Sequence, residues 1–203
     1  MQLRISSVLS LFLLGASAAL LGDHFHVVTG TTEYFAASHA VPFVWSSPIW
    51  FPAAVGLTTV LLAEIRLHLP APRTGVTFRQ GVAGVAAVIG TYAFTALLHA
   101  SPTVPVTALI CVLAVIIWCA LGDRAAALCG VLVAVGGPAV EAVLAAIGVF
   151  RYTPGSDGLF GVGPWLPPLY FAFGVVTASL GELFAAHQKA GVGTRSATLI
   201  DAT

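Results

Sequence analysis

The residue most able to do chemistry in this sequence is Glu141, a carboxylic acid inside a long apolar run. An ionised carboxylate in the middle of a bilayer costs about 3 kcal/mol or more, so such residues usually have a function. Gly136-Gly137-Pro138 lie just before it. Pro138 cannot donate to the carbonyl of Ala134, so we expect a kinked or loosened helix that lines an internal cavity. Three roles stay open for Glu141: contact with a hydroxyl-bearing ligand, packing against a polar group of a neighbouring helix, and proton transport.

A second group with possible chemistry is Asp23-His24-Phe25-His26, with His39 further along the chain. Two histidines at i and i+2 face the same side only in an extended strand. Zinc sites usually need three or four ligands, so His39 would have to fold back to complete one. We therefore predict no metal site and expect a wet loop near lipid headgroups. Three cysteines in apolar runs, without CxxC spacing, are predicted to be small buried apolar residues: Cys111, Cys119 and Cys129.

Other polar residues are isolated along the apolar runs. Tyr92 and Tyr170 carry hydroxyls within apolar segments, and we place them with Glu141 among the candidate ligand-binding residues, although a mid-span Tyr92 can also simply fill a helix. Glu64 with Arg66 or His68, and Glu182 with His187, lie near helix ends and are interpreted as interfacial polar caps. No Ser/His/Asp set, phosphate loop or pair of intramembrane carboxylates is apparent in the sequence. We expect no catalytic residue and no enzymatic activity.

The composition fixes the solvent in which these residues lie. The 203 residues are 58% hydrophobic and only 8% charged, with a mean hydropathy of +0.98, whereas soluble domains carry about 25% charged residues. So few charges cannot cover a soluble surface of this size, so most of the chain must face lipid. The net charge is zero, which gives no basic surface for nucleic acid.

Six segments are long and apolar enough to span a bilayer, which needs about 20 residues. We therefore predict an all-α integral membrane protein, a six-transmembrane-helix bundle that occupies residues 1–186, followed by a polar, frayed tail over residues 187–203. The predicted spans are Ile5 to Leu21, Ser47 to Ile65, Gly81 to Leu98, Val104 to Leu121, Ala125 to Phe150 and Pro164 to Phe184.

The positions of the basic residues test this count. Cytoplasmic loops collect Lys and Arg, and six spans place only Arg151 on one side of the membrane. All the others fall on the opposite side: Arg4, Arg66, Arg73, Arg79, Arg124, Lys189 and Arg195. We therefore expect both termini to be cytoplasmic. A count of five or seven spans would mix the two groups.

Several short motifs, in the same order, resemble the Insig (insulin-induced gene) family of sterol-regulatory membrane proteins. Arg151-Tyr152-Thr153-Pro154, Trp165-Leu166-Pro167 and a later Phe-Ala-x-Gly step are similar to the family's fifth and sixth spans. Further matches are Ser46-Ser47-Pro48-Ile49-Trp50-Phe51-Pro52, His99-Ala100-Ser101 and Asp123-Arg124. The sequence also departs from the family pattern at three places. Cys119-Ala120 stands where the family has a double Trp before its Asp-Arg, Ile49-Trp50 stands where it has a double Trp in the second span, and Arg151 stands where it has a Gln.

The resemblance implies a six-helix bundle with an intramembrane lipid pocket. Animal members bind oxysterols and retain the escort protein Scap in the endoplasmic reticulum. In this sequence Trp50 matches a Trp near the family's ligand, and Asp123 matches an Asp needed for partner association, so Asp123 and the adjacent Arg124 are candidate partner-binding residues. Seven of the eight basic residues are Arg, and Ala, Gly and Val are abundant, which hints at a bacterial source, where the animal partners do not exist. Only the pocket is then expected to carry over.

These observations lead to a non-enzymatic, Insig-like protein that holds a neutral lipid, sterol-like or diacylglycerol, and takes part in lipid sensing or regulation. No cofactor other than this bound lipid is expected. The resemblance also implies a homo-oligomer, with a trimer favoured, in the bacterial inner membrane. The alternative is a small proton-coupled membrane transporter that uses Glu141. It requires a second intramembrane acid or base, which the sequence does not clearly provide.

Overall fold

The described part of the chain contains six helices that are each long and apolar enough to span a membrane. The structure is a computed structural model that describes residues 2–200, with the side chains of residue 37 and of residues 190–200 left outside the description. The prediction of six spans is confirmed, and the chain is a multi-pass integral membrane protein. The helices are α1 (Ile5–Val28), α2 (Trp50–His68), α3 (Phe78–Leu97), α4 (Thr103–Leu121), α5 (Arg124–Ala146) and α6 (Leu166–Ile200).

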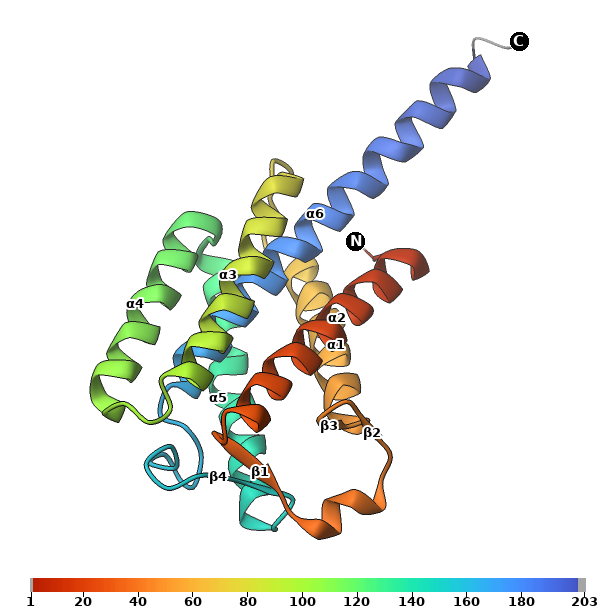
Figure 1. Ribbon diagram of the computed structural model, residues 1–203. Helices are drawn as coiled ribbons and strands as arrows, with labels where there is room; N and C mark the ends of the chain where they lie inside the picture. The colour runs from red at the N-terminus through yellow and green to blue at the C-terminus, as the bar shows by residue number, and fades with distance from the viewer. Residues whose placement is uncertain (1, 201–203) are drawn as a thin grey trace.

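Helix α6 is the central element of the bundle. It packs against α2, α3, α4 and α5, and in Figure 1 it passes between them before extending beyond the others. In its membrane-length segment 72% of the residues are buried, against 39% or fewer in each other helix. Pro167 and Pro168 lie in its first turn, where a missing N–H costs no helical hydrogen bond. Gly174 permits the close approach of α5, because a Cβ there would lie 2.7 Å from the carbonyl oxygen of Cys129.

Two small antiparallel sheets lie at the end of the bundle opposite the N-terminus (Figure 1). Strand β1 (Thr32–Tyr34) pairs with β4 (Phe150–Tyr152), so that Thr32 is opposite Tyr152 and Tyr34 is opposite Phe150. Strand β2 (Phe43–Val44) pairs with β3 (Ser47–Pro48), and a short 3₁₀ helix, Ala36–Ala40, lies between the sheets in sequence. The β1–β4 sheet therefore joins the segment after α1 to the segment after α5.

Two helix ends differ from the predicted spans. Helix α1 continues to Val28 rather than ending at Leu21, so Asp23, His24 and His26 belong to a helix and not to a wet loop. Asp23 and His26 are 5% and 1% exposed and have hydrogen-bond partners inside the bundle, which explains why the helix can continue through them. Helix α5 continues through Pro138 and ends at Ala146, because Phe150 is paired in β4.

Other helix ends also differ from the predicted spans. Helix α3 begins at Phe78, three residues before the predicted start, because Thr77 and Gln80 form a capping box. Helix α6 continues to Ile200 without a break in its backbone at residue 186, and the division into a six-helix domain and a polar tail stays a prediction. Cys129 is buried as expected, but Cys111 and Cys119 are exposed on α4, where we had expected buried residues.

Candidate functional site

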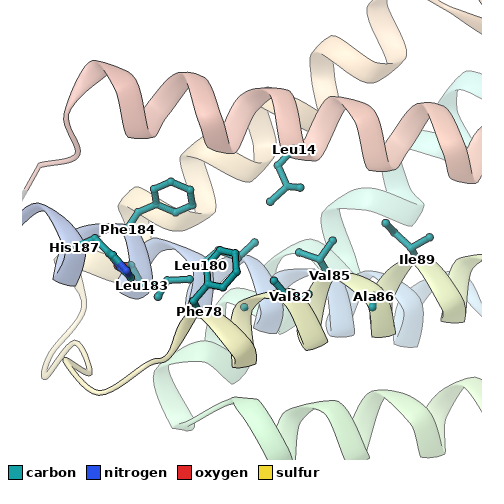
Figure 2. A pocket seen from close by; sticks show the side chains of 11 residues that line it. Leu14, Phe78, Val82, Val85, Ala86, Ile89, Leu180, Leu183, Phe184 and His187 are labelled. Atoms are coloured by element: carbon teal, nitrogen blue, oxygen red, sulfur yellow. The ribbon is translucent and has the colours of Figure 1, made fainter.

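A large cavity lies between α1, α3 and α6, near the end of the bundle that carries the N-terminus. Its volume is about 750 Å³, within the range of small-molecule sites. Figure 2 shows its side chains converging from the three helices. The lining is apolar apart from one imidazole: Leu14 from α1; Phe78, Gly81, Val82, Val85, Ala86 and Ile89 from α3; Leu180, Leu183, Phe184 and His187 from α6. We call it the mouth cavity.

Two narrower cavities continue from the mouth cavity toward the bundle centre. The first, of about 30 Å³, shares Leu14, Val85, Ile89 and Leu180 with it. The second, of about 60 Å³, shares Ile89 with both and is bounded at its far side by polar side chains. We call this second space the inner cavity. Three of the four residues predicted to bind ligand line it together: Tyr92, Glu141 and Tyr170.

Glu141 is fixed by two tyrosine hydroxyls. Tyr152 donates to its Oε2 at 2.7 Å and Tyr170 to its Oε1 at 2.5 Å, while the glutamate is 8% exposed. Gly137 makes the second contact possible, because a Cβ there would lie 2.7 Å from the Tyr170 ring. Gly137 therefore provides room for an aromatic ring, a role that the sequence-based expectation of a kink did not include. The arrangement pairs Glu141 with polar groups and at the same time places it in the cavity wall.

Trp50, the fourth predicted ligand-binding residue, lies at the first turn of α2 and is half-buried. Of the two aromatic residues there, it is Phe51 that lines the inner cavity, and its ring stands at 90° to that of Trp50. Successive side chains of a helix point about 100° apart, so only one of these two neighbours can face the cavity. The sequence alone does not show which of them does.

A second buried carboxylate lies near Glu141, contrary to our expectation of no intramembrane pair. Asp23 accepts hydrogen bonds from Tyr34, at 3.0 Å, and from Ser47. Asp23 and Glu141 line a common space of about 20 Å³, which we call the chamber. Burial, and next the nearby carboxylates, raise the pKa of the Tyr34 and Tyr152 phenols above their usual range, so both remain hydrogen-bond donors.

The histidines of the same segment point to different surroundings. His24 stacks on Trp45, with ring centroids 3.8 Å apart, and contacts Ser46. His26 is buried and contacts Thr95 at 2.8 Å. Within the part of the chain that the structure describes, no group of three or more His, Cys, Asp or Glu side chains could hold a metal ion.

At the other end of the bundle, where we had expected interfacial polar caps, a buried ion network connects α2, the loop that follows it, the N-terminus of α5 and α6. Arg66 is fully buried and contacts Glu182, which is 1% exposed, at 2.6 Å and Asp123 at 2.8 Å. Arg73 contacts Glu182 at 2.8 Å. Glu64 is not part of this network: it accepts a hydrogen bond from the backbone N–H of Leu3 and lies 3.9 Å from His68, one of its two expected partners. The partners of Arg66 are 57 and 116 residues away in sequence, so no local pattern identifies them.

Asp123 and Arg124, the predicted partner-binding residues, differ in exposure. Arg124 is exposed. Asp123 is partly buried and accepts a hydrogen bond from the backbone N–H of Ala126, which caps α5. Burial alone would raise its pKa, but the Ala126 N–H and the guanidinium groups of Arg66 and Arg73 outweigh burial and hold the pKa below its usual range. The sequence motif therefore has a structural use within the chain.

This depressed pKa predicts that the folded protein loses stability at acid pH, which we call the acid limb of its stability profile. Because the pKa of Asp123 is lower in the folded state, its contribution is present above the unfolded value of about 3.9 and is lost as the pH falls through the folded value. We expect the thermal midpoint of the wild type to fall below about pH 4. Asp123→Asn should flatten that limb while keeping the helix cap. The measurement is a set of thermal unfolding curves from pH 3 to 7, with Asp157→Asn, at an exposed site, as control. An unchanged acid limb in Asp123→Asn would contradict the assignment.

Comparison with known proteins identifies the fold. No family model matches this chain. An Insig protein homologue from Mycolicibacterium vanbaalenii is 66% identical over 188 residues, which cover 93% of this chain and 91% of that protein. The crystal structure of MvINS, a mycobacterial Insig homologue from Mycobacterium vanbaalenii, matches with a TM-score of 0.90 and 67% identity over 92% of this chain and 97% of that chain.

A second crystal structure, of a cross-linked trimer of an Arg-to-Cys variant of MvINS, matches with a TM-score of 0.90 and 66% identity. The shares covered are again 92% of this chain and 97% of that chain. These identities extend over more than nine-tenths of the chain. The six-helix membrane protein described here belongs to the Insig family.

Proposed function

We propose that this protein is a non-catalytic lipid-binding protein that holds one neutral lipid, sterol-like or diacylglycerol, within the bundle for lipid sensing or regulation. The observation that carries the proposal is the run of apolar cavities that leads from the mouth cavity to the carboxylate of Glu141. The apolar part of the lipid fills the mouth cavity. Its hydroxyl reaches Glu141, which can accept a further hydrogen bond. The lipid is the only bound group we propose.

The lining favours a neutral ligand. None of the eleven residues that line the mouth cavity is Asp, Glu, Lys or Arg, and His187 is its one titratable side chain. A phosphate group placed there would lose its hydration without gaining a cationic partner, which is unfavourable in a low-dielectric site. The two inner cavities are narrow, with volumes of about 30 and 60 Å³. Entry of the lipid toward Glu141 therefore requires side chains such as Ile89 to move.

The proposal predicts that filling the mouth cavity expels the lipid. Val85 lines the cavity and Val112 is 55% exposed on α4, so Val85→Trp and Val112→Trp are matched substitutions inside and outside the site. Native mass spectrometry of detergent-purified protein, followed by lipid extraction, should find about one neutral lipid per chain in the wild type and in Val112→Trp. Val85→Trp should retain at least tenfold less. Absence of neutral lipid from all three proteins would refute the proposal.

The same spectra report the assembly. A relative with 66% identity has been crystallised as a cross-linked trimer, and we propose a homotrimer for this chain, in the bacterial inner membrane with both termini cytoplasmic. In this setting, occupancy of the cavity biases how α1, α3 and α6 pack and hence which surface other proteins meet. Asp123 and Arg124 stay candidates for such a partner contact.

A second candidate function is a small proton-coupled transporter that uses Glu141. The presence of Asp23 beside the same chamber favours it, because the transporter hypothesis required a second intramembrane acid. A further hollow of about 420 Å³ shares Thr32 and Tyr34 with that chamber. Uptake measurements in proteoliposomes distinguish the two functions. Substrate uptake that is driven by acidification and abolished in Glu141→Gln would establish the transporter. A retained lipid without such uptake would exclude it.

A further inference from the structure

Glu141 is held by two tyrosines that belong to different parts of the fold. Tyr170 lies on α6 beside the inner cavity, and Tyr152 lies in β4 at the end of the bundle. The residues Glu141 and Tyr152 are 8% and 5% exposed. Neither can exchange its partner for bulk water without moving. The Glu141 carboxylate therefore links the wall of the inner cavity, through Tyr170, to the β1–β4 sheet, through Tyr152, and we call this link the joint.

The β1–β4 sheet is tied to the helices by one tyrosine from each strand. Tyr152 of β4 reaches Glu141 on α5, and Tyr34 of β1 reaches Asp23 on α1. Each strand has only three residues. Isolated two-stranded ribbons are marginally stable in water, so these side-chain anchors contribute much of what keeps the sheet in place.

The space around the anchors leaves little room for substitutes. The chamber between the two carboxylates has a volume of about 20 Å³, enough for about one water molecule. Thr32, opposite Tyr152 in the sheet, lines it and is 6% exposed. Its hydroxyl has no hydrogen-bond partner among the described residues. If the Tyr152 bond is lost, the chamber therefore offers little beyond this hydroxyl and about one water molecule to replace it.

The carboxylate also has unused capacity on the cavity side. Two oxygens offer about four acceptor positions, and the two tyrosines occupy one on each oxygen. A hydroxyl donated from the inner cavity would add a third bond and hold the carboxylate more rigidly. Removal of the Tyr170 hydroxyl would have the opposite effect.

We propose that Glu141 couples the inner cavity to the β1–β4 sheet, so that a hydroxyl-bearing ligand in the cavity orders the sheet through Tyr152. The ligand part of this inference rests on the proposed function, whereas the joint itself does not. Occupancy of a site within the bundle is in this way transmitted to the surface opposite the termini, where the strands lie (Figure 1). Coupling of this kind needs only one element whose order both sites bias.

Hydrogen exchange measured by mass spectrometry on the full chain in phosphatidylcholine nanodiscs tests the coupling. The probe is dioleoylglycerol, and its binding is checked separately by native mass spectrometry. Exchange at Thr32–Tyr34 and Phe150–Tyr152 should slow at least threefold when dioleoylglycerol binds the wild type. Tyr152→Phe should still bind the lipid but lose the slowing. Tyr34→Phe is the matched control, because it removes the same atom from the opposite strand without touching Glu141, and it should keep the slowing.

The outcomes separate the coupling from the proposed function. Binding of dioleoylglycerol without slower exchange in the sheet, or full slowing in Tyr152→Phe, overturns the coupling and leaves lipid binding intact. If dioleoylglycerol does not bind, a ligand-free comparison decides. Tyr170→Phe should speed exchange at Phe150–Tyr152 at least twofold relative to the turn over residues 98–102. Unchanged exchange in that variant overturns the coupling.

Discussion

Replacing Arg66 with Met is expected to destabilise the protein more than any other substitution of a charged residue outside the cavities. Arg66 is fully buried and contacts both Glu182 and Asp123. Its removal leaves the buried carboxylate of Glu182 with Arg73 alone, and the breaking of a buried ion pair from one side typically costs about 3–5 kcal/mol. We expect the thermal midpoint in detergent to fall by on the order of 10 °C, measured as the fraction of folded protein that remains after heating. Arg79→Met, at an exposed site on α3, should change it little.

A double variant separates the unpaired charge from lost packing. Arg66→Met combined with Glu182→Met removes one positive and one negative charge and leaves Arg73 near Asp123, at 3.7 Å. Apolar replacement of a whole buried pair is often neutral or stabilising, so the double variant should recover much of the loss. A double variant as unstable as the sum of the single variants would show that the network stabilises through packing and not through charge compensation.

Glu141→Ala is expected to have the largest effect on the bound lipid. It removes the only carboxylate in the wall of the inner cavity and leaves the hydroxyls of Tyr152 and Tyr170 without their acceptor. Lipid retention should fall at least tenfold, which corresponds to about 1.4 kcal/mol or more. Each buried hydroxyl left unsatisfied should further destabilise the fold by about 1–3 kcal/mol. Native mass spectrometry and thermal unfolding of the same preparations measure both effects.

Trp50→Ala is the informative control for that experiment. The Insig resemblance assigns Trp50 to the neighbourhood of the ligand, but it is Phe51 that lines the inner cavity. We therefore expect Trp50→Ala to keep the lipid and Phe51→Ala to weaken its retention. Full retention in Glu141→Ala would instead place the lipid headgroup at the mouth cavity beside His187 and would remove the basis for hydrogen bonding at Glu141.

The sequence by itself determined the membrane architecture. Apolar runs of about 20 residues must be helices in lipid, because every backbone polar group there needs a partner within its own segment. The same reasoning located Glu141 inside a span, since a lone acid in an apolar run is rare enough to be informative. The Insig resemblance also came from local motifs, and the 66% identity to a family member confirms it.

Only the tertiary structure decided which polar residues meet. The hydropathy of the first span falls near Asp23, which suggested a loop, but Tyr34 and Ser47 supply hydrogen bonds that let the helix continue. Arg66 and Glu182 each looked like an interfacial residue, yet they bury each other. Such pairing depends on contacts between residues 11 to 116 positions apart. A carboxylate or guanidinium can be buried only where another part of the chain brings its partner, and no local pattern in the sequence records that partner.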